Sequence, residues 1–380
     1  MTKVVIKQEM TGRVLTVREL NRATLARQML LSRAAAPAIN VIERLVGLQA
    51  QYPQPPYIGL WTRVRDFTRD DLARLIASRT VIRATLMRGT LHLCAANDFT
   101  ELRLTIQSVL DDGFASVLKR MDCPDFDKEN VLAAARAFLS AHPRTFEDIS
   151  AMLAERWPNC EVGAMRYAVR MLLPLLQTPN DSTWCYPGKP EFALAEDWLG
   201  RPMRNAVDVR ALFQRYLAAF GPASISDFQT WSGLSGLKDV ADALKAGLRI
   251  YRDERKRELL DLPDIELPPA DTPAPERFLP EYDNLLLAHT QRARIIPDKH
   301  RVKVFLSALR VRATLLVDGF VRGAWRVDTV KGNARLVIEP FDTLTKANRS
   351  ALIDEAEHLV RFTEPGAKSY EVRFEEEEGV

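Results

Sequence analysis

Apolar residues recur at helical spacing in the middle of the chain, and this pattern gives way to a short hairpin. The apolar side chains of residues 126–141 fall on one helical face, and Thr145 then begins a second helix with a capping-box pattern. A third helix is predicted over residues 162–176, followed by strands at residues 184–186 and 192–194. Three helices followed by a β-hairpin predict a winged-helix motif.

The next segment repeats this order. A helix is predicted over residues 209–220, Ser224 begins a second helix with the same capping pattern as Thr145, and a third helix covers residues 237–247. Residues 250–262 then supply strands. The repeat predicts a second winged-helix motif in tandem with the first.

The N-terminal region follows the same plan less regularly. Thr16 and Thr68 each begin a predicted helix, and a further helix begins at Pro37. Residues 82–95 form a predicted hairpin that turns at Arg88–Gly89. This region is therefore predicted to hold another winged-helix motif.

The C-terminal part of the chain is richer in β-structure. Residues 263–277 are proline-rich and predict a linker. Beyond it, Asp318–Gly319 joins two apolar runs, which is the strongest short signal for a hairpin. The predicted elements of this part are strands at residues 311–317, 320–327, 334–338 and 370–374 and a helix at residues 347–361.

Composition limits the class of protein. Hydrophobic residues make up 47% and charged residues 27% of the 380-residue chain, which is ordinary for a soluble globular protein. No apolar run approaches the ~20 residues that span a bilayer, and the first residues lack the apolar core of a secretory signal. We therefore expect a cytoplasmic protein with no membrane partner. The cysteines form no CxxC pair, so we expect reduced thiols and neither metal nor cofactor; they are Cys94, Cys123, Cys160 and Cys185.

The net charge of +3 conceals an uneven distribution of charge. Residues 375–378 are four successive glutamates, whereas arginine is frequent in residues 79–88, 292–312 and 322–335. This distribution permits binding to a polyanion. The alternative is a solvated surface on which arginines pair with acidic side chains.

Four groups of motifs follow one another along the chain. They are Leu45-Val-Gly-Leu-Gln49-Ala-Gln51 with Leu60-Trp-Thr-Arg63; Arg88-Gly-Thr-Leu-His92-Leu; Phe278-Leu-Pro-Glu-Tyr-Asp283 with Leu287-Ala-His289 and Arg292-Ala-Arg294; and Val317-Asp-Gly-Phe-Val-Arg-Gly-Ala-Trp-Arg326. In this order they resemble the winged-helix DNA glycosylases of the AlkZ and YcaQ type. The resemblance covers nearly the whole chain.

The resemblance implies an α+β fold with three tandem winged-helix motifs around a DNA-binding channel and a β-rich C-terminal portion. On this basis we divide the chain into winged-helix units at residues 1–122, 123–203 and 204–262, a linker at residues 263–277, and a β-rich region at residues 278–380. The resemblance also implies a Gln-x-Gln or Gln-x-Asp motif that positions the hydrolytic water. Gln49 and Gln51 match the Gln-x-Gln form of the AlkZ branch. Members of that branch act on bulky N-alkyl purines and in some cases on interstrand crosslinks, and are associated with self-resistance to genotoxic natural products.

The chemistry of glutamine limits the substrate. Hydrolysis of an N-glycosidic bond builds positive charge on the sugar, and most enzymes with such a transition state use a carboxylate. A glutamine amide does not ionise and can only donate and accept hydrogen bonds, so two glutamines would hold and aim a water. An N7-alkylguanine or N3-alkyladenine is already cationic and leaves without a general acid. The alternative interpretation of Gln49 and Gln51 is two polar residues that cap a helix end.

Further residues are predicted to contact DNA, each with a structural alternative. His92 is also read as a structural histidine, Tyr282 and Asp283 as a structural pair, and His289 as part of a core hydrogen-bond network. At the Asp318–Gly319 hairpin, Phe320 would act as an apolar wedge and the arginines as phosphate or minor-groove contacts, unless its aromatic residues pack inward. The predicted set is Arg88, His92, Tyr282, Asp283, His289, Arg292, Arg294, Phe320, Arg322, Trp325 and Arg326.

The leading hypothesis is a monomeric, monofunctional DNA glycosylase that acts on double-stranded DNA carrying an alkylated purine. No lysine is placed by a motif as a Schiff-base nucleophile, so base release without strand cleavage is expected. The alternative is a non-catalytic tandem winged-helix regulator or lesion sensor, since a fold does not fix a function.

Overall fold

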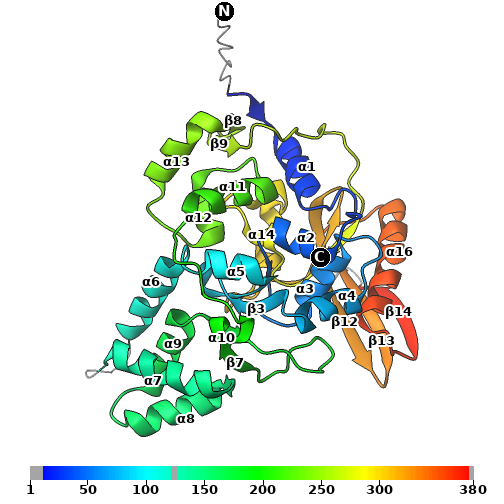
Figure 1. The fold of residues 1–380 in the computed structure, drawn as a ribbon. Coiled ribbons are helices and arrows are strands. Elements are labelled where there is room, and N and C mark those ends of the chain that lie inside the picture. Colours follow the sequence, from blue (N-terminus) through cyan, green and yellow to red (C-terminus); the bar gives the residue numbers. More distant parts are fainter. Residues whose placement is uncertain (1–11, 121–125, 376–380) are drawn as a thin grey trace, which may run out of the picture.

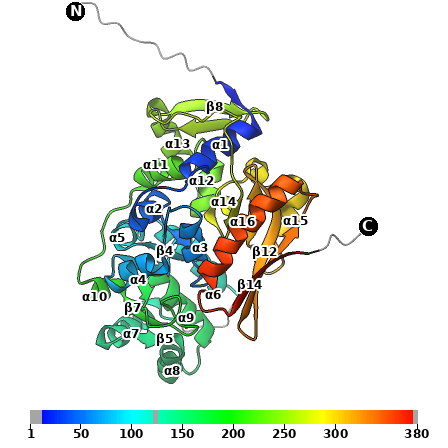
Figure 2. The same ribbon diagram turned by 90° about the vertical axis from the view of Figure 1, so that its right-hand side faces the viewer.

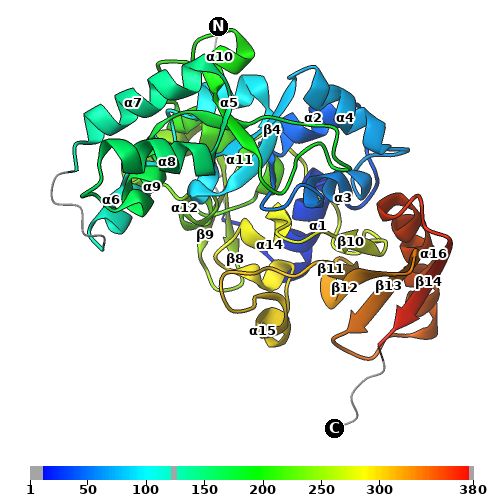
Figure 3. The ribbon, with the colours of Figure 1, turned by 90° about the horizontal axis from the view of Figure 1, so that it is seen from below.

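The computed structural model describes residues 12–120 and 126–375 of the chain. Within these residues the protein has sixteen α-helices and three β-sheets, arranged as Figure 1 shows. The mixed content of helices and sheets confirms the predicted α+β class. From the direction of Figure 3, α7 to α9 lie at one end of the molecule, α16 with β12 to β14 lies at the other, and α1, α3 and α14 lie between them.

The first region contains the helices predicted from capping patterns. Thr16 and Thr68 each form a capping box, with Glu19 and Asp71 respectively. An additional helix, α3, was not predicted; it begins with prolines, which are well tolerated in a first helical turn. The elements are β1 (Val14–Leu15), α1 (Val17–Arg27), α2 (Ala38–Arg44), β2 (Leu48–Gln49), α3 (Pro55–Trp61), α4 (Arg69–Ala77), β3 (Val81–Thr85), the 3₁₀ turn η1 (Met87–Gly89), β4 (Leu91–Ala95), α5 (Ala96–Leu102) and α6 (Gln107–Leu118).

The second region departs from the prediction in its hairpin. The third helix ends at Leu172 rather than at residue 176, because Pro174 cannot continue it. Residues 175–177 instead form a strand that pairs with residues 192–194. The strand predicted at residues 184–186 is wrong, since Cys185 has a left-handed backbone (φ 62°) there. The elements are α7 (Lys128–Ala141), β5 (Arg144–Thr145), α8 (Phe146–Arg156), α9 (Val162–Leu172), β6 (Leu175–Gln177), β7 (Glu191–Leu194) and α10 (Ala195–Leu199).

The third region matches its prediction closely. Ser224 forms the expected capping box with Asp227, and Gly233 ends the same helix with a left-handed backbone. The N-terminal strand β1 joins the hairpin of this region in parallel, with Val14 opposite Arg252. The elements are α11 (Val209–Phe220), α12 (Ile225–Ser232), α13 (Lys238–Leu244), η2 (Lys245–Gly247), β8 (Arg249–Asp253) and β9 (Glu258–Asp261).

The C-terminal region is a five-stranded sheet in the order β10-β11-β12-β13-β14, with α16 packed on one face (Figure 2). Residues 263–276, before it, form neither helix nor strand and lie along α1, where Arg18 and Arg22 donate to backbone carbonyls of the segment. The elements are β10 (Arg277–Leu279), α14 (Asn284–Leu287), η3 (Arg292–Arg294), η4 (Asp298–His300), α15 (Arg301–Val304), β11 (Thr314–Val317), β12 (Phe320–Val330), β13 (Asn333–Pro340), α16 (Lys346–Thr363) and β14 (Ser369–Phe374).

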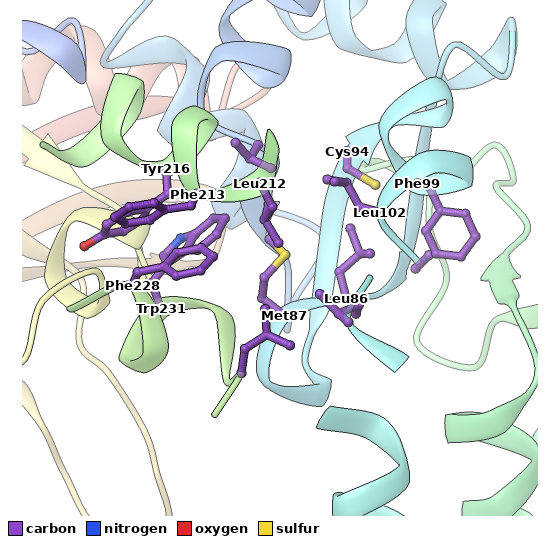
Figure 4. Packing of buried hydrophobic residues seen from close by; sticks show 14 of the residues in the cluster. Leu86, Met87, Cys94, Phe99, Leu102, Leu212, Phe213, Tyr216, Phe228 and Trp231 are labelled. Atoms are coloured by element: carbon purple, nitrogen blue, oxygen red, sulfur yellow. The ribbon is translucent and has the colours of Figure 1, made fainter. Parts of the chain in front are cut away.

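The largest apolar core joins the first and third regions. Leu86 and Met87, at the turn of the β3–β4 hairpin, belong to the same buried cluster as Leu212, Phe213 and Trp231 of α11 and α12 (Figure 4). Burial of apolar surface is the main stabilising contribution in such a cluster. The turn of this hairpin therefore lies inside the protein rather than at its surface.

Other contacts also cross the predicted unit boundaries. The six-stranded sheet has the order β2-β4-β3-β6-β7-β5, so the first two predicted units share one sheet, with Arg83 opposite Gln177. Arg27 binds the Asp261 carboxylate through two hydrogen bonds of 2.7 and 2.8 Å, and both side chains are buried. The units therefore pack as parts of one body, and the proposed boundaries remain a prediction.

Neither a candidate membrane span nor a metal-binding cluster occurs in the part of the chain that the structure describes. Residues 12–120 and 126–375 contain no helix with the length and apolarity needed to cross a bilayer. In the same residues, no three His, Cys, Asp or Glu side chains lie close enough together to hold a metal ion. Cys94 and Cys185 are free thiols, whereas Cys160 is disulfide-bonded, so the expectation of reduced thiols is wrong for Cys160.

Candidate active site

The Gln-x-Gln segment lies on β2 and in the turn that follows it. Positive φ angles at Val46 (57°) and Gly47 (92°) turn the chain away from α2. A Cβ at Gly47 would lie 3.1 Å from atoms of β4, so glycine is required there for both conformation and space. Gln49 then pairs with His92 on β4. The two glutamines could align only if the chain leaves the helix before Gln49, and the strand meets that condition.

Hydrogen bonds fix the orientation of both glutamine amides. Gln49 is 7% exposed, and its Oε1 accepts a hydrogen bond of 2.7 Å from Nη2 of Arg88. Gln51 is half-buried, and its Oε1 accepts from the backbone N–H of Leu91 at 3.2 Å. Both donors belong to the β3–β4 hairpin, which therefore sets the position of the two side chains.

Arg83, on the same hairpin, holds the backbone between the two glutamines. Its Nε donates to the carbonyl of Ala50 at 2.9 Å, and its Nη2 donates to the carbonyl of Gln51 at 3.0 Å. Nη1 donates to Oε1 of Gln177 at 2.5 Å. Burial lowers the pKa of Arg83 to about 10. Arg83 was not among the predicted site residues. The one indication in the sequence is that a charged residue occurs within a mostly apolar strand.

Arg88 is a partly buried cation bound to neutral groups. Besides Gln49, its guanidinium donates to the backbone carbonyl of Trp231 in α12. Burial, and to a smaller extent the nearby positive charge of Arg292, lower the pKa of Arg88 to about 10. Its backbone is left-handed, with φ 57°. Arg88 thus connects the glutamine motif to the third region.

His92 lies behind the motif as a neutral imidazole. Its side chain is fully buried, and Nδ1 lies 3.0 Å from the carbonyl of Thr90. Because a carbonyl only accepts, Nδ1 carries the hydrogen. Burial lowers the pKa of His92 to about 3, and the charge of Arg88 acts in the same direction. Its Nε2 is enclosed and has no hydrogen-bond partner among the described residues.

Arg292 is the other cation near this cluster. Its guanidinium lies over the ring of Phe305, 4.2 Å from the centroid. Burial lowers its pKa, with a smaller contribution from Arg301. Its Nε is buried without a hydrogen-bond partner in the part of the chain that the structure describes. Arg88, His92 and Arg292 are therefore the predicted residues that lie on the Gln49 side of the motif.

Tyr282 and Asp283 have different environments. Asp283 is buried and accepts two hydrogen bonds of 2.8 Å from Arg63, which favours the alternative of a structural residue. Tyr282 has a left-handed backbone (φ 59°) and is only partly buried. Its ring centroid lies 6.2 Å from that of Tyr52, the half-exposed residue that follows Gln51. Tyr52 is a second aromatic residue at the motif that the sequence analysis missed.

His289 and Arg294 lie in the interior. Nε2 of His289 is 3.0 Å from the carbonyl of Phe220, and burial lowers the pKa of His289 to about 3. Arg294 is 3% exposed and donates to the carbonyl of Pro222 at 2.8 Å. These contacts favour the core hydrogen-bond network over direct contact with DNA, so the proposed interface omits both residues.

The turn of the β11–β12 hairpin is held against α1. The carboxylate of Asp318 binds Arg18 and Arg22, and the carbonyl of Gly319 accepts from Asn21 at 2.7 Å. A Cβ at Gly319 would lie 2.5 Å from a side-chain carbon of Leu25, so α1 leaves no space there. Asp318 and Gly319 are therefore anchored to α1, whereas Phe320, the next residue, is partly exposed.

The predicted DNA-contacting side chains of β12 are divided between interior and surface. Trp325 is 8% exposed and donates to the carbonyl of Leu279 at 2.9 Å, as expected for an aromatic residue packed inward. Arg322 pairs with Asp342 at 2.8 Å. Arg326 is half-exposed and pairs with Glu375 at 2.7 Å, and Phe320 is partly buried. Within the described residues, no hydrogen bond or ion pair joins this hairpin to the glutamine cluster.

Comparison with known proteins gives a consistent result. A family model described as "DNA glycosylase AlkZ-like" matches residues 42–362, a range that includes Gln49 and Gln51. A Streptomyces sahachiroi protein named "Interstrand DNA cross-link repair glycosylase" is 24% identical in an alignment of 366 positions that covers 88% of this chain and 93% of that protein. The solved structure of Streptomyces sahachiroi DNA glycosylase AlkZ is similar in fold, with a TM-score of 0.77 and 21% identity, over 95% of this chain and 100% of that one.

Proposed function

Because the chain belongs to the AlkZ-like DNA glycosylase family, we propose that it hydrolyses the N-glycosidic bond of cationic N-alkylated purines in double-stranded DNA. Bulky N7-alkylguanine or N3-alkyladenine adducts are the proposed lesions. The name of the Streptomyces relative extends the proposal to interstrand crosslinks, and self-resistance to a genotoxic natural product is the proposed role. The three regions act as tandem winged-helix motifs around a DNA channel.

The observation that carries this proposal is the arrangement of Gln49 and Gln51. Both side chains are held by the β3–β4 hairpin, Gln49 through Arg88 and Gln51 through the Leu91 amide. A catalytic group that is fixed before the substrate binds avoids the entropic cost of ordering it during the reaction. Gln49 and Gln51 are therefore the proposed catalytic residues, which position the water without acting as a base.

In the proposed reaction, the bond between C1′ and the base nitrogen breaks, and its electron pair goes to the base. A cationic alkylpurine leaves as a neutral molecule, so no protein acid is needed. The oxygen of the water bonds to C1′, and one proton is released to solvent. An unmodified purine leaves as an anion unless it is protonated, so a neutral glutamine pair is expected to leave normal DNA intact. The products are a free base and an abasic site in an unbroken strand.

The test uses a duplex oligonucleotide that carries a single N7-alkylguanine. The expected result is free base in the supernatant and an abasic site that breaks only after alkali treatment. The double variant Gln49→Ala with Gln51→Ala should lose at least about 100-fold in the single-turnover rate. Gln214→Ala, an exposed glutamine of α11, should keep the rate. Tight binding without base release would instead favour a regulator or lesion sensor.

For the DNA interface we propose the exposed and partly exposed members of the predicted set. Arg326 and Arg322 would contact phosphate groups, Phe320 would contact a base step, and Tyr282 would lie near the lesion. Their partial exposure and position on strands or turns support this assignment. We propose a monomeric, cytoplasmic protein that uses no metal or cofactor.

A further inference from the structure

The two glutamine amides present the same end to the substrate side. A guanidinium and a backbone N–H can only donate, so Oε1 of Gln49 must face Arg88 and Oε1 of Gln51 must face Leu91. Exchange of oxygen and nitrogen in either amide would place two donors against each other. The ends left over are the two Nε2 groups, and neither has a hydrogen-bond partner within residues 12–120 and 126–375.

Arg88 differs from the fully buried arginines that bind carboxylates. Arg27 and Arg63 each bind a carboxylate through two hydrogen bonds. The side chain of Arg88 is partly buried, and its hydrogen bonds go to the neutral carbonyl groups of Gln49 and Trp231. A charge withdrawn from water without a carboxylate partner costs stability, as it also does at Arg103, so what sets Arg88 apart is that its hydrogen bond orients Gln49.

The backbone of Arg88 gives an independent indication of function. It is left-handed at φ 57°, and Gly233 at the end of α12 lies so close that a Cβ there would be 3.3 Å from the Arg88 backbone. Strained residues held by their surroundings occur often at active sites. The strain and the unbalanced charge both fall on the residue that binds Gln49.

We propose that Arg88 is a positioning residue for base release, which fixes Gln49 so that its amide N–H₂ group faces the substrate. This inference rests on the proposed function. The backbone N–H of Leu91 likewise binds Oε1 of Gln51 and leaves its N–H₂ group facing the substrate. The motif therefore presents two hydrogen-bond donors, which bind acceptor atoms of the water or the substrate. The charge-assisted bond from Arg88 also polarises the Gln49 amide, which makes its N–H₂ group a stronger donor.

The donor pattern determines how a water can be held. A water oxygen has two lone pairs, and the attack on C1′ requires one of them. If both amides donated to the same water, no lone pair would remain for the attack. The two amides therefore serve two acceptors, which narrows the proposed function: one amide holds the water, and the other donates to an oxygen or nitrogen atom of the substrate.

Replacement of each glutamine by glutamate tests the donor role directly. Gln49→Glu and Gln51→Glu keep an oxygen for Arg88 and for the Leu91 amide, but they remove the N–H₂ group. We expect each glutamate variant to lower the single-turnover rate of base release by about 100-fold. The single variants Gln49→Ala and Gln51→Ala should lower the rate by the same factor. Thermal melting should not fall below wild type, because every contact described for the two side chains is kept and the carboxylate introduced by Gln49→Glu also neutralises Arg88.

The outcomes separate this inference from the proposed function. If the alanine variants lose activity while the glutamate variants stay within threefold of wild type, the donor role is overturned and the catalytic site stands. If the alanine variants also keep full activity, the proposed catalytic residues are wrong. Loss in both series, with normal melting, supports the donor role.

Arg88→Met and Arg88→Lys test the positioning role. We expect a loss of about 30-fold or more in the single-turnover rate, with the dissociation constant for lesion DNA within twofold of wild type. Arg103→Met is the matched control, since Arg103 is also buried and donates to the neutral groups of Gln107, Met171 and Leu173. An unchanged rate in Arg88→Met, or a rise in the dissociation constant as large as the loss of rate, would overturn the proposal. If Arg88→Met does not fold, the glutamate variants decide alone.

Discussion

Two hairpins were predicted to contact DNA, and their turns are held in different ways. At the β3–β4 turn, Arg88 binds the neutral carbonyl groups of Gln49 and Trp231. At the β11–β12 turn, the carboxylate of Asp318 forms ion pairs with Arg18 and Arg22. The second arrangement is sufficiently explained by anchoring of the C-terminal sheet to α1. The first costs stability and adjoins the glutamine motif. The partners of the charged side chains therefore separate these two hairpins better than the density of arginine along the sequence does.

The largest effect on stability is expected where a balanced pair is broken inside the protein. Asp283→Asn leaves the buried guanidinium of Arg63 without its carboxylate, and the free energy of unfolding should fall by about 4 kcal/mol. Urea denaturation measures the change. The double variant Arg63→Met with Asp283→Leu removes both charges and should lose less than Asp283→Asn does. An equal loss in both would show that charge balance is not the decisive factor.

Release of the β11–β12 turn should have a smaller effect. Asp318→Ala leaves the fully buried side chain of Arg22 with carbonyl and amide acceptors only, and should cost about 2 kcal/mol in the free energy of unfolding. The rate of base release by the folded protein should stay within twofold of wild type, since this turn makes no contact with the glutamine cluster. A large loss of rate at unchanged stability would place the turn in the reaction after all.

The stability of the protein should fall at acidic pH because His92, on the β3–β4 hairpin, is neutral in the folded state. The pKa of this imidazole is about 3 in the folded protein against 6.5 for an unperturbed histidine, so the unfolded chain takes up the proton first as the pH falls. The contribution of His92 to stability is therefore full above pH 6.5 and is lost progressively as the pH falls from 6.5 towards 3. Urea denaturation at pH 6.5, 5.5 and 4.5 should give a flatter dependence for His92→Asn. Parallel slopes for the two proteins would contradict the buried neutral imidazole.

The smallest effect is expected at the surface of β12. Arg326→Ala should weaken binding to duplex DNA by about threefold and should lower by about one the slope of the logarithm of affinity against the logarithm of salt concentration. Fluorescence anisotropy at several salt concentrations measures both. Arg252→Ala, an exposed arginine on β8, serves as the control and should change neither. Equal effects of the two substitutions would show that binding depends only on net charge.

Local signals predicted the fold well where the contacts themselves are local. A capping box involves only the N-cap residue and the residue three positions after it, so it can be recognised in the sequence. This signal correctly predicted the helices that begin at Thr16, Thr68, Thr145 and Ser224. The strand at residues 184–186 was wrong because pairing depends on register across distant segments, and two short apolar runs competed for the same partner. Helix α3 was missed because its prolines indicate equally a loop or a helix start.

The site could be predicted only in part, because most of its contacts join segments that are distant in the sequence. Gln49 and Gln51 were identified through a family resemblance, since two glutamines near a helix end carry little information by themselves. The roles of Arg83 and Arg88 depend on which carbonyl oxygen each guanidinium reaches, and neighbours in sequence do not reveal this. Burial of Asp283, His289 and Arg294 likewise follows from the packing of separate regions.

The pairing of β1 with β8 affects the order in which the chain is made and folded. Synthesis proceeds from the N-terminus, so β1 and α1 leave the ribosome well before β8, α11 and β9 exist. The strand pairing of Val14 with Arg252 can form only after residue 252 has been synthesised, and the ion pair of Arg27 only after Asp261 has been synthesised. A ribosome stalled before β8 would therefore present α1 with its apolar face uncovered. Contacts between such distant segments form slowly, and a nascent chain of this protein is expected to depend on chaperones until the third region emerges.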